Sequence, residues 1–210
     1  MKDSKSAVIL DAAIKVIAEK GYQYATTEEI AREAGVAKGL IHFYFENKLD
    51  LLLSVILLFW QKINTINKEK LSSLKSPVDK INALFTTFQD LLSRDKKSLY
   101  WGRILNESLP QIHSIKSEAL RKKQQAIVRE NKKLMKTVDS LIQEGQKKGI
   151  ITNDLKPQVL RQILGGASQL LTYGMYLQLY PKRRIEYDED DVRIAMETLI
   201  EKFTTNRCAN

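Results

Sequence analysis

The chain has 210 residues, of which 34 are lysine or arginine and 25 are aspartate or glutamate, so its formal net charge is +9. Its four prolines, nine glycines and many helix-forming residues predict an all-α fold, long enough for a small domain and a larger one. The single cysteine, Cys208, excludes an internal disulfide framework and favours a cytoplasmic location.

The positive charge does not by itself indicate DNA binding, because it is concentrated away from the N-terminal part. Residues 1–50 contain seven basic and eight acidic side chains, a net of −1, so the other 160 residues carry +10. Any DNA contact near the N-terminus therefore depends on where a few cations lie.

The first predicted element is an amphipathic helix over residues 6–20, which ends at Gly21. Before it, residues 1–5 form a short basic arm that we expect to be loose in solution. Asp11 and Lys15 interrupt the helix sequence, so it does not have the apolar core of a signal peptide. Its inward stripe consists of Ile9, Leu10, Ala13, Val16 and Ile17.

A capping box predicts where the second helix begins. The hydroxyl of Thr26 can accept the backbone N–H of Glu29, and the Glu29 carboxylate can accept that of Thr26. The helix therefore begins at Thr27. Gly35 ends it, because glycine adopts the left-handed conformation without a Cβ clash.

A third helix is predicted from Lys38 to Phe45, directly after the turn. Ile41, Tyr44 and Phe45 have the spacing to reach a core, which leaves the opposite side exposed. Two helices of about two turns, joined at a glycine-containing turn, have the form of a helix-turn-helix, whose second helix fits the major groove of DNA. The exposed side carries Lys38, Gly39, His42 and Phe43.

The motifs of this region occur in a fixed order over residues 8–51. They are Ile9-Leu10-Asp11-Ala12-Ala13, Glu19-Lys20-Gly21-Tyr22, Ile30-Ala31-Arg32-Glu33-Ala34-Gly35-Val36, Lys38-Gly39 and Tyr44-Phe45-Glu46-Asn47-Lys48. In this order they resemble the DNA-binding domain of the TetR/AcrR family of bacterial repressors. The resemblance implies a three-helix DNA-binding domain over residues 1–50 and a helical effector-binding and dimerisation domain over residues 51–210, with about nine helices in all.

The exposed side of the third helix has the chemistry for DNA contacts. Lys38 can reach a phosphate, the Gly39 N–H can approach the DNA backbone closely, and His42 and Phe43 can touch base edges or thymine methyl groups. The alternative is an exposed helix of a protein-interaction module. The resemblance implies a DNA-binding set of Thr26, Thr27, Lys38, Gly39, His42, Phe43, Tyr44 and Lys48.

Three positions depart from the usual pattern of the family. Ala37 replaces a capping serine or threonine, Leu40 a small polar residue, and His42 a tyrosine. Two phosphate-binding hydroxyls are therefore missing, so the general mode of binding is expected but the operator sequence is not predictable.

Residues 48–74 are predicted to form one long helix with Asn47 as its N-cap. Apolar residues cover most of its circumference, so we expect both domains to bury it and the helix to connect them. Its apolar run, Leu49–Trp60, contains Asp50 and Ser54 and is shorter than the ~20 residues that a membrane span needs. We therefore expect no membrane association.

Start and stop signals divide the remaining sequence. Ser76-Pro77 and Asp188 mark helix beginnings, Gly149 marks a helix end, and residues 204–210 are expected to be a frayed tail. The five further predicted helices cover residues 77–93, 100–109, 114–148, 157–179 and 189–203.

Aromatic residues on three of these helices predict a site for a small hydrophobic effector. The resemblance to family members that sense acyl-CoA implies a fatty acyl-CoA as one candidate. For each residue alone, plain core packing is an equally good interpretation. A few polar side chains would orient the ligand. The predicted ligand-binding set is Phe85, Phe88, Tyr100, Trp101, Arg103, Ile104, Glu107, Gln169, Tyr173 and Tyr176.

The helix over Ser114–Lys148 is strongly basic, with nine basic and three acidic residues between Arg121 and Lys148. Its basic side is most simply a solvated surface. The other interpretation is that Arg121, Lys122 or Arg129 contacts the phosphates of coenzyme A, as the resemblance to acyl-CoA-sensing family members implies.

A homodimer interface is predicted on the last two helices. Glycine in a helix interior costs ~1 kcal/mol relative to alanine, so paired glycines indicate close approach of a partner helix. An apolar stripe on the last helix would complete a four-helix interface, unless both stripes face only the domain's own core. The predicted interface residues are Gly165, Gly166, Ser168, Met196, Leu199 and Phe203.

Catalytic patterns are lacking. His42 and His113 are the only histidines, neither has metal-ligand spacing to other residues, and no phosphate-binding glycine loop occurs. We therefore expect no enzyme activity, metal or cofactor. The expected function is a ligand-responsive repressor that releases a palindromic operator, and the alternative is an all-helical module whose basic helix binds an acidic partner or membrane surface.

Overall fold

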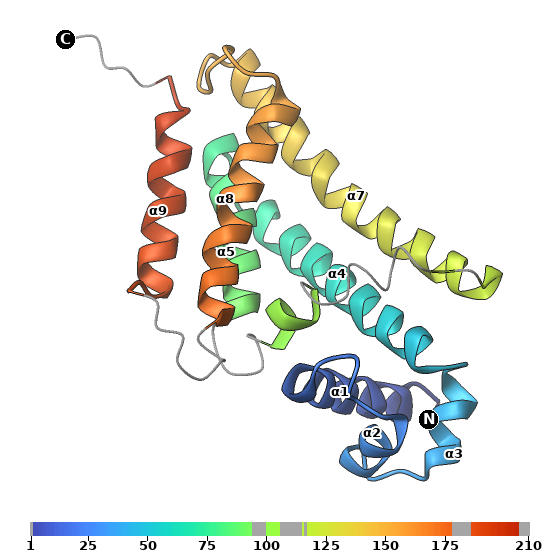
Figure 1. Cartoon of the computed structure of the whole chain (residues 1–210). Helices are drawn as coiled ribbons and strands as arrows, with labels where there is room; N and C mark the ends of the chain where they lie inside the picture. The colour runs from blue at the N-terminus through green and yellow to red at the C-terminus, as the bar shows by residue number, and fades with distance from the viewer. Residues whose placement is uncertain (1, 94–99, 106–114, 116, 178–185, 206–210) are drawn as a thin grey trace. The chain divides into compact units, whose positions relative to one another are not determined.

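The computed structural model confirms the all-α fold (Figure 1). Within the residues that it describes there is no β-strand, and a short helical segment covers residues 100–105. The described residues are 2–93, 100–105, 115, 117–177 and 186–205. The longer helices are α1 (Lys2–Lys20), α2 (Thr27–Glu33), α3 (Lys38–Tyr44), α4 (Lys48–Ser72), α5 (Pro77–Ser93), α7 (Glu118–Lys147), α8 (Pro157–Leu177) and α9 (Glu189–Lys202).

The chain divides into two compact units. The first comprises Met1–Lys62 with Asp95–Glu130, and the second comprises Ile63–Arg94 with Asn131–Asn210. The first unit is thus larger than the DNA-binding domain predicted over residues 1–50. Helices α4 and α7 contribute residues to both units.

Local signals in the sequence correctly predicted both ends of α2 and the beginning of α9. The capping box of Thr26 and Glu29 opens α2, and a second one, of Asp188 and Asp191, opens α9. Gly35 ends α2 with φ +64°, a conformation that side chains with a Cβ rarely adopt. These signals act within a few residues, so the sequence alone reveals them.

Two predictions about the chain ends are wrong for the residues that the structure describes, which leave out Met1 and residues 206–210. The arm expected to be loose is helical from Lys2, since neither glycine nor proline interrupts the sequence before α1. Near the other end, the Thr205 N–H donates to the Ile150 carbonyl at 2.7 Å, and the Thr152 N–H donates to the Phe203 carbonyl at 2.9 Å. Residues 204 and 205 are therefore paired rather than frayed, because these backbone groups find partners in the loop after α7.

Helices α1, α2 and α3 form a small cluster, which we call the head (residues 2–45). Its centre consists of Ile9, Ile17, Ile30 and Ile41, all 1% exposed or less. In the rest of the first unit, Phe59 of α4 is fully buried and packs on Trp101, with ring centroids 5.1 Å apart.

Of the described helices, α4 alone is long and apolar enough to span a membrane. Its apolar composition has a simpler cause, because its side chains fill the core. Those fully buried in the first unit are Leu51, Leu52, Leu53, Val55, Ile56 and Phe59.

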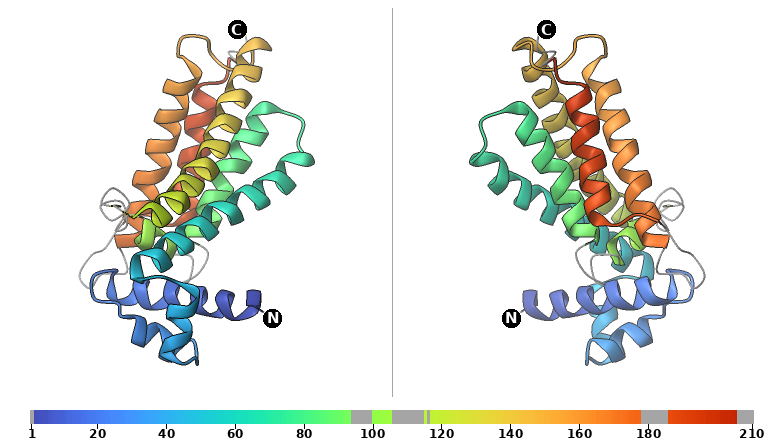
Figure 2. Two further views of the ribbon diagram at one scale, coloured as in Figure 1. Left: turned by 90° about the vertical axis from the view of Figure 1, so that its right-hand side faces the viewer. Right: turned by 90° about the vertical axis from the view of Figure 1, so that its left-hand side faces the viewer.

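The second unit has its own hydrophobic core. Helices α5, α8 and α9 contact one another, and α8 and α9 lie alongside each other in both views of Figure 2. The Arg161 Nε donates to the Asp139 carboxylate at 2.7 Å and so joins α8 to α7. The buried core residues are Ile81, Leu84, Val138, Leu141, Ile142, Ile151, Leu160, Leu164, Met196 and Ile200.

Candidate nucleic-acid interface

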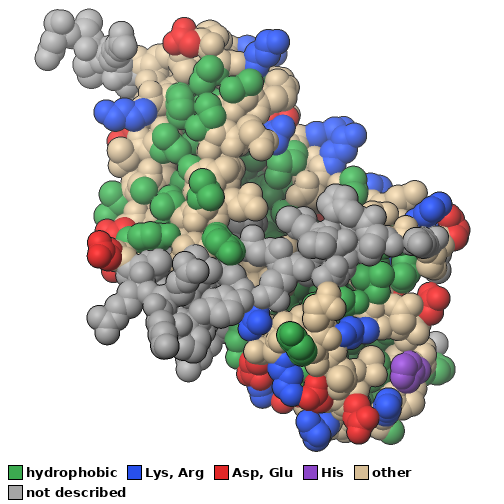
Figure 3. Space-filling view, viewed as in Figure 1, with side chains coloured by type: hydrophobic (Ala, Val, Ile, Leu, Met, Phe, Trp, Pro, Cys, Tyr) green, Lys and Arg blue, Asp and Glu red, His purple; other side chains and the backbone are tan. Residues whose placement is uncertain are grey.

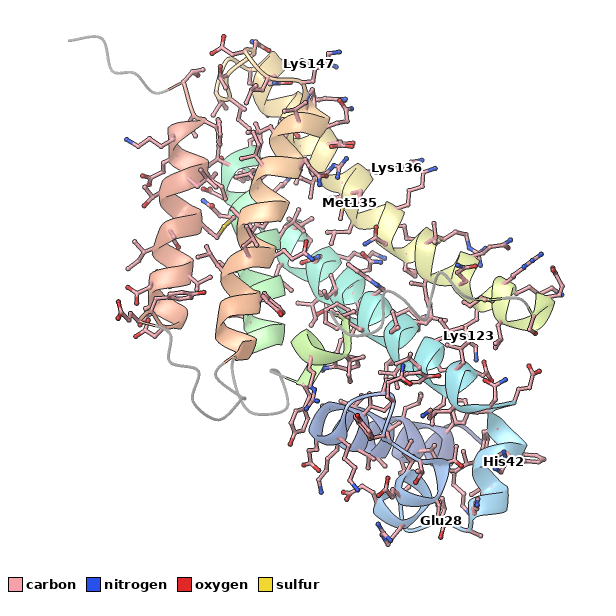
Figure 4. All side chains as sticks on the ribbon, viewed as in Figure 1. Glu28, His42, Lys123, Met135, Lys136 and Lys147 are labelled. Carbon is pink, nitrogen blue, oxygen red and sulfur yellow. The ribbon has the colours of Figure 1, made fainter. Side chains whose placement is uncertain are left out.

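The exposed side of α3 is the one that the sequence predicted. Ile41 is 1% exposed and Phe45, the C-cap, is 5% exposed, so both anchor the helix in the head. Lys38, Gly39, His42 and Phe43 lie on the surface, and Phe43 is 65% exposed. His42 projects outward from α3 (Figure 4). A cation, an open backbone and two ring side chains are thus presented together.

Lys38 is held by an acidic residue of the neighbouring helix. Its ammonium lies 3.3 Å from the carboxylate of Glu28, which is in the first turn of α2. The two side chains are 55% and 71% exposed, so the ion pair contributes little stability and can open at little cost. Lys38 is therefore available to an anion that approaches the surface.

Thr26 has a structural role at the start of α2. Its hydroxyl accepts the Glu29 N–H at 3.2 Å and donates to the Glu29 carboxylate at 3.1 Å. The Lys20 ammonium, and then the Thr26 hydroxyl, lower the pKa of Glu29. The stabilisation from this carboxylate is present above its unfolded pKa and is lost as the pH falls through the lowered one. The phosphate contacts of Thr26 and the half-buried Thr27 stay predictions.

Lys48 contacts the head itself in this structure. Its ammonium donates to the carbonyls of Tyr22, Gln23 and Ala25 at 2.9, 3.1 and 3.0 Å. It also lies 4.6 Å from the centre of the Tyr22 ring, and burial lowers its pKa. An ammonium has three N–H donors and all are used here, so Lys48 fastens the loop between α1 and α2 to the start of α4. Its predicted phosphate contact would require these bonds to change.

Sequence reasoning missed a partly buried ion pair near the end of α3. The Lys123 ammonium of α7 donates to the Asp50 carboxylate and, at 2.7 Å, to the Ser54 hydroxyl. The other Asp50 oxygen accepts the Glu46 N–H at 3.1 Å, in the turn between α3 and α4. Asp50 stood out in an apolar run, and a charge at such a position needs a partner.

The predicted effector residues of the segment 100–105 belong to the first unit and pack within it. Trp101 and Ile104 are buried, and the Tyr100 hydroxyl donates to the Glu19 carboxylate at 3.0 Å. The Arg103 guanidinium donates to the carbonyls of Ala18 and Glu19 at 2.5 and 3.2 Å. Cations at a helix C-terminus satisfy its last carbonyls, so Arg103 caps α1 here.

The other predicted effector residues belong to the second unit. Phe85 is half-buried against its core, whereas Gln169 and Tyr173 are exposed. The described members of the set are thus divided between two units and are not gathered within one. The side chains of Phe88 and Tyr176, and the whole of Glu107, lie outside the described residues.

Comparison with known proteins gives the family. Residues 9–55 match the model of bacterial regulatory proteins of the tetR family. Over 169 residues the chain is 30% identical to the fatty acid metabolism regulator protein of Bacillus subtilis. This alignment covers 79% of this chain and 80% of that protein. The chain is a TetR-family transcriptional regulator.

Solved structures share the fold of this TetR-family regulator. FadR from Bacillus subtilis, solved in complex with stearoyl-CoA, aligns with a TM-score of 0.74 and 24% identity over 92% of this chain and 96% of its own. AibR, solved with isovaleryl coenzyme A and operator DNA, aligns with a TM-score of 0.71 and 15% identity over 93% of this chain and 97% of its own. At these identities the likeness establishes the fold.

The predicted dimer residues of this regulator divide between surface and core. Met196 is 2% exposed, and Leu199 and Phe203 are half-buried against the same core, so this part of the stripe faces the protein's own interior. Ser168 is 2% exposed. Gly165 and Gly166 are open, because no atom of the described residues lies within 4 Å of an added Cβ.

A different apolar surface on α8 was missed. Its members recur at helical spacing, so they share one face of the helix. Leu170 is 73% exposed, and Val159, Ile163 and Tyr173 are between 40% and 43% exposed. Hydrophobic side chains form a band over α8 and α9 in the space-filling view (Figure 3). We call this surface the α8 stripe: Val159, Ile163, Gly166, Leu170 and Tyr173.

The basic side of α7 is exposed as predicted. Arg121 pairs with Glu118 at 3.7 Å across one turn, and Lys136 projects away from the helix into solvent (Figure 4). The other exposed cations of this side are Lys122, Arg129 and Lys132. Contact of this surface with a ligand stays a prediction.

Proposed function

We propose that this protein is a homodimeric repressor that binds palindromic operator DNA and is released by a fatty acyl-CoA. The main support is the exposed side of α3, which presents Lys38, Gly39, His42 and Phe43 from a head that matches the tetR family model. AibR, which shares the fold, was solved with operator DNA.

Each head would place α3 in a major groove. Lys38 would contact a phosphate, which fixes position, and His42 and Phe43 would contact base edges, which carry sequence information. Two heads related by a two-fold axis would occupy successive grooves, about one helical turn apart. The site would therefore be palindromic.

Glu28 should weaken this binding, because its carboxylate lies beside Lys38 and would face the DNA phosphates. Replacing Glu28 with glutamine should tighten binding about threefold at low salt, with a smaller gain at high salt. Fluorescence anisotropy of labelled DNA from upstream of the gene, in a salt series, measures this effect. Glu201→Gln at the end of α9 also removes an exposed charge and should leave DNA binding unchanged. Equal effects of the two variants would contradict the assignment of the Glu28 region to the DNA-binding surface.

The nature of the effector rests on relatives. One relative is named a fatty acid metabolism regulator, and a protein of the same fold was solved with stearoyl-CoA. The apolar core of the second unit suits an acyl chain, and the exposed cations Lys132 and Lys136, on the part of α7 in the same unit, suit the phosphates of coenzyme A. The effector must bind two arrangements of the protein unequally, since equal affinity shifts no equilibrium.

The α8 stripe is the proposed contact between protomers, with Gly166 allowing close approach. Replacing Leu170 with glutamate would bury two charges in each dimer and should raise the dimer dissociation constant about 100-fold. Analytical ultracentrifugation measures the change, and operator binding should fall with it. Val128→Glu on α7 alters a side chain that is 57% exposed and provides the matched control. A Leu170→Glu protein that stays dimeric would place the interface elsewhere.

A gel shift with the DNA upstream of the gene, with and without palmitoyl-CoA, tests the function as a whole. A specific complex that palmitoyl-CoA dissolves is the expected result. Only non-specific binding, equally strong for unrelated DNA, would favour the interaction module instead.

A further inference from the structure

Asn67 is a polar side chain in an apolar place. It lies in the part of α4 that belongs to the second unit, and it is only 4% exposed. Ile63, one turn before it, is fully buried, and Leu71, one turn after it, packs on the second unit's core. The three residues share one inward face of the helix. The amide therefore replaces a hydrocarbon side chain in this row.

The Asn67 amide has no hydrogen-bond partner in the described part of the chain. Its Oδ1 and its Nδ2 are both buried and unpaired. A buried amide without partners destabilises the fold, because it has lost its bonds to water. Thr87, which is 1% exposed, shows the usual arrangement, since its hydroxyl donates to the Ala83 carbonyl at 2.8 Å.

A second unpaired atom lies on the next helix. The Oδ1 of Asn82 on α5 is buried without a partner in the described residues, and Asn82 follows the buried Ile81. The interior of the second unit thus offers an unpaired donor and two unpaired acceptors beside a cluster of buried hydrophobic residues. A hydrocarbon chain satisfies none of these groups, whereas an oxygen atom on the chain accepts from the Asn67 amide.

We propose that Asn67 binds the effector through an oxygen of its acyl part, and that the Asn82 Oδ1 accepts from this oxygen where it is a hydroxyl. This inference rests on the proposed effector class and adds to it that the acyl part is recognised as more than hydrocarbon. The oxygen is either the thioester carbonyl or a hydroxyl on the chain, and both accept from an amide N–H. A site built to pair with an oxygen discriminates strongly against an analogue that lacks it.

Three ligands distinguish the sources of that oxygen: palmitoyl-CoA, 3-hydroxypalmitoyl-CoA and the thioether S-hexadecyl-CoA, which has no acyl oxygen. Isothermal titration of the full-length protein should show that an oxygen-bearing ligand binds at least tenfold more tightly than the thioether. If palmitoyl-CoA binds more tightly than the thioether, the oxygen is the thioester carbonyl. If only 3-hydroxypalmitoyl-CoA binds more tightly than the thioether, the oxygen is the chain hydroxyl.

The variant Asn67→Leu keeps the branched shape and the number of side-chain heavy atoms, and it should remove this preference while it retains binding of the thioether. Without ligand its melting temperature should rise by about 3 °C, because an unpaired amide is removed. Thr87→Val is the matched control, since it removes a satisfied hydroxyl, and it should neither raise the melting temperature nor alter the preference. Asn67→Ala also removes the amide but adds no larger side chain, so it tests whether loss of the preference comes from the missing amide and not from the bulk of leucine.

Equal affinities of the three ligands for the wild-type protein would overturn the role of Asn67 and leave the effector class intact. If both Asn67 variants still bind the oxygen-bearing ligands more tightly than the thioether, the role of Asn67 is overturned as well. Failure of all three ligands to bind would overturn the proposed effector, and the role of Asn67 with it.

Discussion

Replacing Lys38 with alanine should weaken binding to every DNA sequence roughly tenfold at low salt, without changing the order of preference among sequences. Lys38 is the exposed cation at the start of α3, and its side chain is 55% exposed. A phosphate contact releases counterions from DNA, so its loss should reduce the salt dependence by about one unit of slope for each bound head. Anisotropy titrations over a range of salt concentrations measure both quantities.

The matched control is Lys15→Ala. Lys15 also forms an exposed ion pair, with Glu33 of α2 at 2.7 Å, but it lies on α1 and is not among the predicted DNA contacts. The Lys15 variant should retain the wild-type slope. If both variants lose affinity equally, the effect comes from overall charge and the assignment of Lys38 to a phosphate is wrong.

Replacing Lys123 with methionine should destabilise the first unit by about 2 kcal/mol, because it leaves the Asp50 carboxylate, whose side chain is 12% exposed, without its cation. Asp50 also accepts the Glu46 N–H at the end of α3, so the loss should loosen the attachment of α3. Hydrogen exchange should therefore quicken over residues 45–54, and operator affinity should fall several-fold. Chemical denaturation measures the stability.

Two further variants separate the ion pair from general effects. Lys122→Met changes the adjacent exposed lysine and should leave exchange unchanged. The double variant Lys123→Met with Asp50→Asn removes both charges, so it should recover part of the lost stability. No recovery would mean that Lys123 acts through packing, for example against Phe45, whose ring centre lies 5.9 Å from its ammonium.

The fold was largely predictable because its signals are local. Capping boxes, positive-φ glycines and the period of apolar residues each act within a few positions, so the limits of α2, α3 and α9 could be derived from sequence. The pairing of Thr205 with Ile150 was not predictable, because its partner lies 55 positions away in the chain.

The exposed side of α3 was predictable for the same reason, but the roles of several cations were not. Lys48 and Arg103 bind backbone carbonyls of other elements, and sequence does not reveal which carbonyls lack partners. Met196 belongs to a stripe that suits either a core or an interface. Periodicity identifies an apolar face but not whether its neighbour is the same chain or a second one.

The uninterrupted course of α4 across both units constrains how such proteins can be recombined. Deleting one residue near the junction of Lys62 and Ile63 would rotate all that follows by about 100° and shift it by about 1.5 Å, since each helical residue contributes that step. Hybrid regulators that borrow a head from another family member should therefore be spliced in the turn at residues 45–47, where the phase of the helix is not yet set.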